Sequence, residues 1–93
     1  MSALDEAAAQ FRACRDRHNE LQSRRRAAEE EAARAEREVQ KLNNFGNALM
    51  RGAARDRMFR AKADVRTIKA QCQKAAKVLN EARGQFHRLN GAS

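Results

Sequence analysis

The chain has 93 residues and a formal net charge of +8, and it contains no proline, tryptophan or tyrosine. So short a chain holds one small domain at most, and its four phenylalanines leave few large side chains for a compact core. A bias toward Ala, Glu, Lys, Leu and Arg is typical of long helices and coiled coils. The composition therefore excludes several domains and favours an all-α chain.

The positive charge is unevenly distributed along the chain. Residues 1–42 carry nine Lys or Arg and nine Asp or Glu, whereas residues 43–93 carry eleven and three. A basic excess suits a nucleic acid, an anionic lipid or an acidic protein surface. We therefore expect a partner with an acidic surface, although the charge does not choose its class.

The sequence shows neither a membrane span nor a secretory signal. No apolar run approaches the roughly 18–20 residues that cross a bilayer. The first ten residues, MSALDEAAAQ, have no basic start and no hydrophobic stretch. These features predict a cytoplasmic protein without a membrane span, and they leave signal-independent export open.

The first predicted helix, residues 3–42, contains a heptad repeat. Small and apolar residues recur at steps of three and four, with His18 and Arg25 filling the two gaps. The small and apolar residues of this seam are Leu4, Ala7, Phe11, Cys14, Leu21, Ala28, Ala32, Ala35, Val39 and Leu42. Such a seam is typical of a coiled coil. Polar seam residues commonly fix register or oligomeric state, and we expect this role for His18 and Arg25.

The second predicted helix, residues 54–89, repeats the pattern. Its seam consists of Met58, Ala61, Val65, Ile68, Cys72, Ala75, Leu79, Ala82, Phe86 and Leu89. When the chain is folded back near residue 48, the two seams face each other, so that Phe11 meets Phe86. The same register brings glutamates of the first helix near basic residues of the second, as Glu29–Lys69, Glu36–Lys62 and Glu38–Arg57. This mirror predicts an antiparallel two-helix coiled-coil hairpin.

The ends of both helices carry expected signals. Ser2 is predicted to cap the first helix, and Asn90-Gly91 to stop the second, leaving residues 90–93 as a frayed tail. The turn is predicted over residues 43–53. There Asn43, Asn44, Gly46 and Asn47 would supply the conformational freedom that a turn requires.

Another assembly would satisfy the same mirror. Two copies of one long helix could pack antiparallel, with residues 42–54 forming a stutter in the repeat. The Asn/Gly cluster favours the hairpin. Because a lone alanine-rich hairpin is thin, we also expect a homodimer or a hetero-oligomer, with a dimeric four-helix bundle as one such form.

Bulky apolar residues gather around the predicted turn and have two interpretations. Phe45, Leu49, Met50 and Phe59 lie off the seam. They could form a hydrophobic tip that binds a protein partner, since Met and Phe are favoured at adaptable interfaces. Alternatively, Phe45 and Leu49 fold over the end of the seam and close it. The sequence leaves both open.

A basic stripe is predicted along the second helix, formed by Arg51, Arg55, Lys62, Arg66, Lys69 and Lys77. It could contact the phosphates of a nucleic acid in a salt-sensitive way. Alternatively it is a solvated face on which Lys62 and Lys69 are engaged by glutamates. No aromatic residues interleave with the basic ones, so base stacking is unsupported.

The sequence offers little for catalysis. It has no phosphate-binding glycine loop, no metal-ligand cluster and no nucleophile–base pair. Cys14 and Cys72 are offset in the mirror by more than a disulfide allows, so we expect free thiols. A narrow two-helix seam is not expected to contain a pocket of ligand size. The prediction is a non-enzyme without catalytic, metal-binding or cofactor-binding residues.

Phe45-Gly46 stands at the turn of the predicted hairpin, and in this outline the chain resembles the small secreted hairpins of type VII secretion systems. Those proteins carry a Trp-x-Gly turn, whereas this chain has no tryptophan. The hairpin outline is also similar to coiled-coil proteins of flagellar and type III export, which are generally longer. The resemblance implies a secreted partner of a bacterial secretion system.

Three functions are therefore carried forward. The first is a structural, adaptor or assembly module that acts through protein–protein contacts. The second is a nucleic-acid-binding module that uses the basic stripe. The third is the secreted partner that the resemblance implies. A similarity of architecture alone does not establish which of these functions is right.

Overall fold

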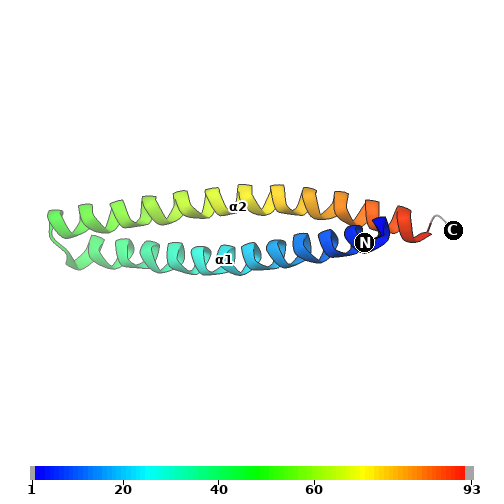
Figure 1. Cartoon of the computed structure of the whole chain (residues 1–93). Helices are drawn as coiled ribbons and strands as arrows, with labels where there is room; N and C mark the ends of the chain where they lie inside the picture. Colours follow the sequence, from blue (N-terminus) through cyan, green and yellow to red (C-terminus); the bar gives the residue numbers. More distant parts are fainter. Residues whose placement is uncertain (1, 92–93) are drawn as a thin grey trace. The chain divides into compact units, whose positions relative to one another are not determined.

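The computed structural model describes residues 2–91 and confirms an all-α hairpin. Helix α1 spans Ala3–Phe45 and helix α2 spans Ala48–Gly91, and the two pack against each other in opposite directions (Figure 1). The described residues include no strand. The chain reverses between the helices, so the alternative of one continuous long helix is wrong.

Helix α1 begins where the sequence predicts, because Ser2 caps it. The amide N–H of Asp5 donates to Ser2 Oγ at 3.1 Å, and the amide N–H of Glu6 donates to the Ser2 carbonyl oxygen at 3.1 Å. A hydroxyl at this position satisfies an amide that has no partner inside the helix. The carboxylates of Asp5 and Glu6 lie in the first turn, where the helix dipole favours negative charge.

The turn is much shorter than predicted. Asn43 and Asn44 belong to α1, and only Gly46 and Asn47 lie between the helices. The reason is that Asn47 caps α2 at once: its Oδ1 accepts from the Met50 amide at 2.8 Å, and its carbonyl oxygen accepts from the Arg51 amide at 3.0 Å. The predicted turn region, residues 43–53, and the predicted helix start at residue 54 are therefore wrong.

Gly46 has a steric rather than a conformational role. None of the described residues has a positive φ, so the turn does not need the backbone freedom that we expected from its glycine and asparagines. Instead, a Cβ on Gly46 would lie 2.9 Å from Leu42 Cδ2 and 3.0 Å from the Leu42 carbonyl oxygen. That same oxygen accepts from the Gly46 amide at 2.8 Å. The chain thus turns tightly over Leu42.

Helix α2 also extends beyond its predicted end. Asn90 and Gly91 are helical, so the predicted frayed tail is wrong for these two residues, and its last two positions, 92 and 93, lie outside the described residues. Asparagine and glycine are weak helix formers, but a position at the end of a helix costs little. Arg88 lies in the last turn, where the helix dipole favours a positive charge.

The chain divides into two compact units, each containing a segment of both helices. Unit 1, here the terminal unit, consists of Met1–Ser23 and Ala70–Ser93, and unit 2, here the turn unit, consists of Arg24–Lys69. The buried residues are Ala7, Leu21, Cys72, Leu79 and Ala82 in the terminal unit and Leu42, Ala54 and Ala61 in the turn unit. All of these except Ala54 are predicted seam residues, and none of the buried residues described is polar.

Contacts between the helices follow the predicted register within each unit. In the terminal unit, the rings of Phe11 and Phe86 meet edge to face, with centroids 5.7 Å apart and planes at 64°. In the turn unit, Lys62 Nζ lies 3.8 Å from Glu36 Oε1. Glu29 accepts from Arg25 of its own helix rather than meeting Lys69. Most other seam residues are only half-buried, so the core is as thin as its alanine content implies.

Candidate interaction surfaces

The apolar tip, defined as Phe45, Leu49, Met50 and Phe59, is solvent-exposed. Phe45 is 87% exposed, Leu49 83%, Phe59 60% and Met50 48%. The interpretation in which Phe45 and Leu49 fold over the end of the seam is therefore wrong. Leu42 and Ala54 provide the burial near the turn instead.

The short turn fixes the positions of three tip residues. Phe45 is the last residue of α1, and Leu49 and Met50 lie in the first turn of α2. The side-chain cap of Asn47 on the Met50 amide holds that first turn. Because the connection has two residues and hydrogen bonds at both sides, it presents Phe45 and Leu49 at or next to helix ends rather than on a long loop.

The chain on both sides of the turn carries positive charge only. From Val39 to Arg55 the sequence contains no Asp or Glu, while it contains Lys41, Arg51 and Arg55. Arg51 is half-buried, and its Nη1 donates to the Gly46 carbonyl oxygen at 2.5 Å. Lys41 and Arg55 are exposed. An apolar surface bordered by cations suits a partner with an apolar patch and acidic edges.

The predicted basic stripe is not uniform. Arg55, Arg66 and Lys69 are exposed in the turn unit, but Lys62 is half-buried beside Glu36, and Arg51 is engaged at the turn. Lys77 is also exposed and belongs to the terminal unit. Within the turn unit, three of the five stripe residues thus remain on an open surface.

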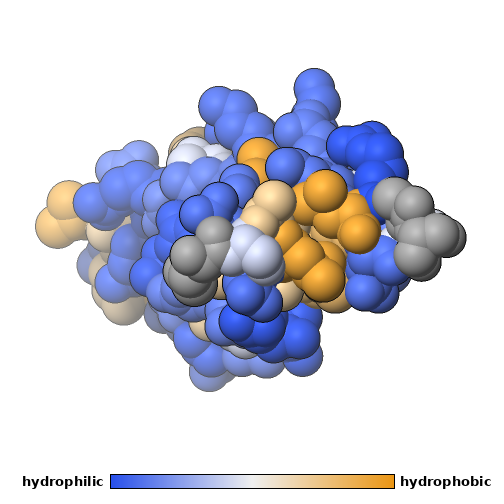
Figure 2. Space-filling model, turned by 45° about the vertical axis from the view of Figure 1, so that its right-hand side comes forward, coloured by the Kyte–Doolittle hydropathy of each residue, from blue (hydrophilic) through white to orange (hydrophobic). Residues whose placement is uncertain are grey.

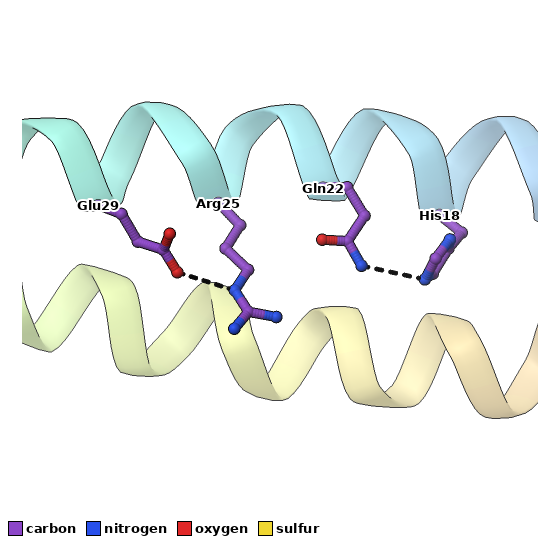
Figure 3. Close-up of polar contacts among 4 residues, drawn as sticks. All are labelled: His18, Gln22, Arg25 and Glu29. Atoms are coloured by element: carbon purple, nitrogen blue, oxygen red, sulfur yellow. Dashed lines mark hydrogen bonds and ion pairs between the residues drawn. The ribbon is translucent and has the colours of Figure 1, made fainter.

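His18 and Arg25 lie on the side of α1 that faces α2 (Figure 3). Both are half-buried. In the terminal unit, His18 Nε2 lies 3.3 Å from Gln22 Nε2. In the turn unit, Arg25 Nε donates to Glu29 Oε1 at 2.9 Å. Each polar seam residue is therefore satisfied by the residue one turn further along its own helix, and this local pairing lets it occupy a partly apolar position.

A groove lies between the two helices of the terminal unit, and the sequence did not predict it. Its volume is about 410 Å³, and it is lined by Ala13, Cys14, Arg17, Leu21, Gln71, Lys74, Ala75 and Val78. The expectation that the seam holds no pocket of ligand size is therefore wrong. Cys14 and Ala75 are small seam residues, and the long side chains beside them border the space rather than fill it. The sequence signal that could have predicted the groove is the presence of two small seam residues, Cys14 and Ala75, near the long side chains of Arg17 and Lys74.

Both cysteines belong to the terminal unit and are free. Cys72 is buried, with 3% of its surface exposed, whereas Cys14 is half-buried and lines the groove. The two thiols therefore differ in access. Cys14 is the one that a reagent entering the groove would meet.

A second recess of about 360 Å³ lies against α1 in the turn unit and is lined by Arg34, Arg37, Glu38 and Lys41. All four side chains are charged and exposed. Nearby, Arg34 Nη2 donates to Glu31 Oε2 at 2.6 Å, and this hydrogen bond raises the pKa of the Arg34 guanidinium above its ordinary value. Arginine is charged at any physiological pH, so the shift creates no switch.

Other exposed apolar residues occur in the terminal unit. Val78 is 48% exposed, and the outermost seam residues, Leu4 and Leu89, are 36% and 41% exposed. On the face shown in Figure 2, hydrophobic side chains gather in one area with hydrophilic side chains around it. The molecule therefore leaves apolar surface uncovered in both units.

Among residues 2–91, no three His, Cys, Asp or Glu side chains are grouped so that they could hold a metal ion. Neither described helix has a stretch long and apolar enough to cross a bilayer. The structure defines the chain as an all-α two-helix hairpin protein. Comparison with protein-family models, curated proteins and solved structures finds no match.

Proposed function

We propose that this chain is a non-enzymatic adaptor or assembly module that binds a protein partner through its apolar tip. The observation that carries the proposal is the exposure of Phe45 and Leu49, at 87% and 83%, on either side of a two-residue turn. Contiguous apolar patches left exposed on a protein surface commonly mark interaction sites, and we propose that the tip residues form such a patch.

The energetics of such a contact are favourable. Fully burying a Phe or Leu side chain contributes about 1.5–3 kcal/mol each. The Asn47 cap and the bond from Arg51 to the Gly46 carbonyl hold the turn before any partner arrives. A preorganised site loses less conformational entropy on binding, so more of the burial energy appears as affinity.

The charge near the tip supports a partner with an acidic surface. Lys41 and Arg55 are exposed, and no acidic residue lies between Glu38 and Asp56. Complementary charge at the edge of an interface accelerates association and selects among partners more than it adds affinity. We therefore propose acidic residues around an apolar pocket on the partner.

The test compares the wild-type chain with the Phe45→Asp/Leu49→Asp variant. Tagged protein is used to recover partners from extracts of the source cells, and far-UV circular dichroism checks the helix content. A partner retained by wild type and lost by the variant, with helicity unchanged, supports the proposal. Leu89→Asp is the matched control, because Leu89 is also an exposed apolar residue but belongs to the terminal unit. Equal recovery by the tip variant and wild type would contradict the proposal.

The thin core supports assembly with a second chain. Most seam residues are only half-buried, and a two-helix hairpin of this kind gains stability when another chain covers it. We propose a homodimer or a hetero-oligomer. Sedimentation equilibrium over a range of concentrations separates a stable monomer from a dimer.

Nucleic-acid binding is the second candidate, and the exposure of Arg55, Arg66 and Lys69 in the turn unit supports it. Binding of this kind weakens steeply as salt is added, because it releases counterions from phosphates. Fluorescence anisotropy with labelled duplex DNA and single-stranded RNA tests it. The variant Arg55→Gln/Arg66→Gln/Lys69→Gln should bind more weakly and with a shallower salt dependence. No binding to either probe at low salt removes this candidate.

A further inference from the structure

The groove of the terminal unit is apolar at its base and open on one side. Leu21 is 2% exposed, and Cys14 and Ala75 are half-buried beside it. Val78, at 48% exposure, lies at the edge. All of these residues belong to the terminal unit, so the groove is independent of the apolar tip.

The dimensions favour a helix as the occupant. On α1 the lining runs from Ala13 to Leu21, which is about 12 Å at ~1.5 Å per residue. On α2 it runs from Gln71 to Val78, a similar length. A trough two turns long between antiparallel helices accepts the apolar ridge of a third helix. Small-molecule sites normally enclose most of their ligand, and an open trough between only two helices does not.

The charge of the groove favours an acidic occupant. Arg17 and Lys74 come from different helices and border the groove, and none of the lining residues is acidic. Glu20 lies 3.7 Å from Arg17, but both side chains are more than half exposed. An exposed contact of this kind is weak, so Arg17 remains available to a partner. A second copy placed symmetrically on the same groove would bring these cations against one another.

We propose that this groove binds an amphipathic helix of a partner protein, with an apolar ridge over Leu21, Cys14 and Ala75 and acidic residues beside Arg17 and Lys74. The contact would add a third helix to the terminal unit and cover half-buried seam residues that the hairpin leaves open. It uses a different surface from the apolar tip and does not depend on what the tip binds.

Cys14 reports occupancy in the unaltered chain. Its alkylation by iodoacetamide is followed by mass spectrometry of the fragment that contains it, while buried Cys72 serves as the internal reference. The probe is a synthetic amphipathic helical peptide about five turns long, with a Leu/Ala stripe flanked by glutamates. The matched peptide has lysine at every glutamate position. We expect the glutamate peptide to slow alkylation of Cys14 by about tenfold at saturation, and the lysine peptide to have little effect.

Charge reversal sharpens the test. In the Arg17→Glu/Lys74→Glu variant we expect the preference to invert, so that only the lysine peptide protects Cys14. Lys77→Glu is the control, since Lys77 is exposed in the same unit but does not line the groove. It should leave the preference for the glutamate peptide in place.

Several results would overturn the proposal. They are equal protection by both peptides, no protection by either, or protection that rises with the concentration of the chain alone, which would mean that a second copy covers the groove. The two-peptide comparison uses the wild-type chain, so it decides the question even if the reversal variant does not fold.

Discussion

Gly46 and Leu42 approach so closely that a side chain at position 46 would have to displace Leu42 or shift the backbone. A Cβ at Gly46 would lie 2.9 Å from Leu42 Cδ2 and 3.0 Å from the Leu42 carbonyl oxygen. The methyl group could shift, but the backbone oxygen is held by its hydrogen bond with the Gly46 amide. Glycine is therefore favoured at the residue before the capping Asn47 by these contacts and not by its dihedral angles.

Gly46→Ala should lower the free energy of unfolding by about 1 kcal/mol, because overpacking displaces Leu42 or the backbone. Urea denaturation followed by circular dichroism measures the change. An unchanged midpoint would show that the turn relaxes without cost, contrary to this expectation.

Gly52→Ala should have the opposite effect. Gly52 is exposed in the first part of α2, and a Cβ there would meet nothing within 4 Å. Replacing a mid-helix glycine by alanine without strain stabilises by about 0.5–1 kcal/mol. The same denaturation measurement applies, and Gly84→Ala provides a replicate in the terminal unit, where a Cβ is equally unobstructed. Loss of stability in both variants would rule out this account.

Asn47→Ala should destabilise the hairpin by about 1 kcal/mol, since the Met50 amide at the start of α2 loses the Asn47 side-chain oxygen that accepts its hydrogen bond. Asn47→Asp preserves the acceptor and adds a charge that the helix dipole favours, so it should be neutral or stabilising. Thermal and urea unfolding of the two variants are compared with wild type. If alanine and aspartate behaved alike, the cap would not be what stabilises the turn.

Phe11 and Phe86 should be energetically coupled. Their rings are 5.7 Å apart in an edge-to-face arrangement, and the Arg83 guanidinium lies 5.7 Å from the Phe11 centroid. A double-mutant cycle with Phe11→Ala and Phe86→Ala is expected to give a coupling energy of about 0.5–1.5 kcal/mol. Additive effects of the two substitutions would show that the rings act independently in solution.

Replacing the polar seam residues should strengthen association. The His18→Leu/Arg25→Leu variant adds apolar surface on the seam and removes two groups whose hydrogen bonds are local. Polar seam residues commonly specify oligomeric state at a cost in stability. We expect the variant to be about 1 kcal/mol more stable and to form larger or tighter oligomers by sedimentation equilibrium. Lower stability would show that the local pairs contribute more than the added apolar area.

The hairpin was predictable because the seam follows a simple period. Steps of three and four over both helices, together with their mirror, locate nearly every buried residue, and the Phe11–Phe86 contact follows directly. The mirror locates the reversal near residue 48, next to Gly46 and Asn47, but the length of the turn was not predictable from composition. Asn43 and Asn44 resemble turn residues, yet one asparagine cap at position 47 is enough to start α2 immediately.

The sequence left open whether Phe45 and Leu49 are exposed or close the end of the seam, and only their exposure of 87% and 83% decides between the two. The exposure of a side chain depends on where the helix ends, and a shift of a few residues decides it. The groove was missed for another reason. Seam spacing predicts which residues face inward, but it does not show where Cys14 and Ala75 are too small to fill the space between Arg17 and Lys74.

The two-residue turn also has a consequence for the order in which the chain folds. Contacts of the turn unit join segments that are near in sequence, whereas the Phe11–Phe86 contact joins the two ends of the chain. Closing a long loop costs more entropy than closing a short one, and local contacts form sooner. Folding should therefore begin at the turn around Asn47 and proceed along the seam toward the ends of the chain. The terminal unit is then expected to form last, and to open first under denaturant or mechanical load.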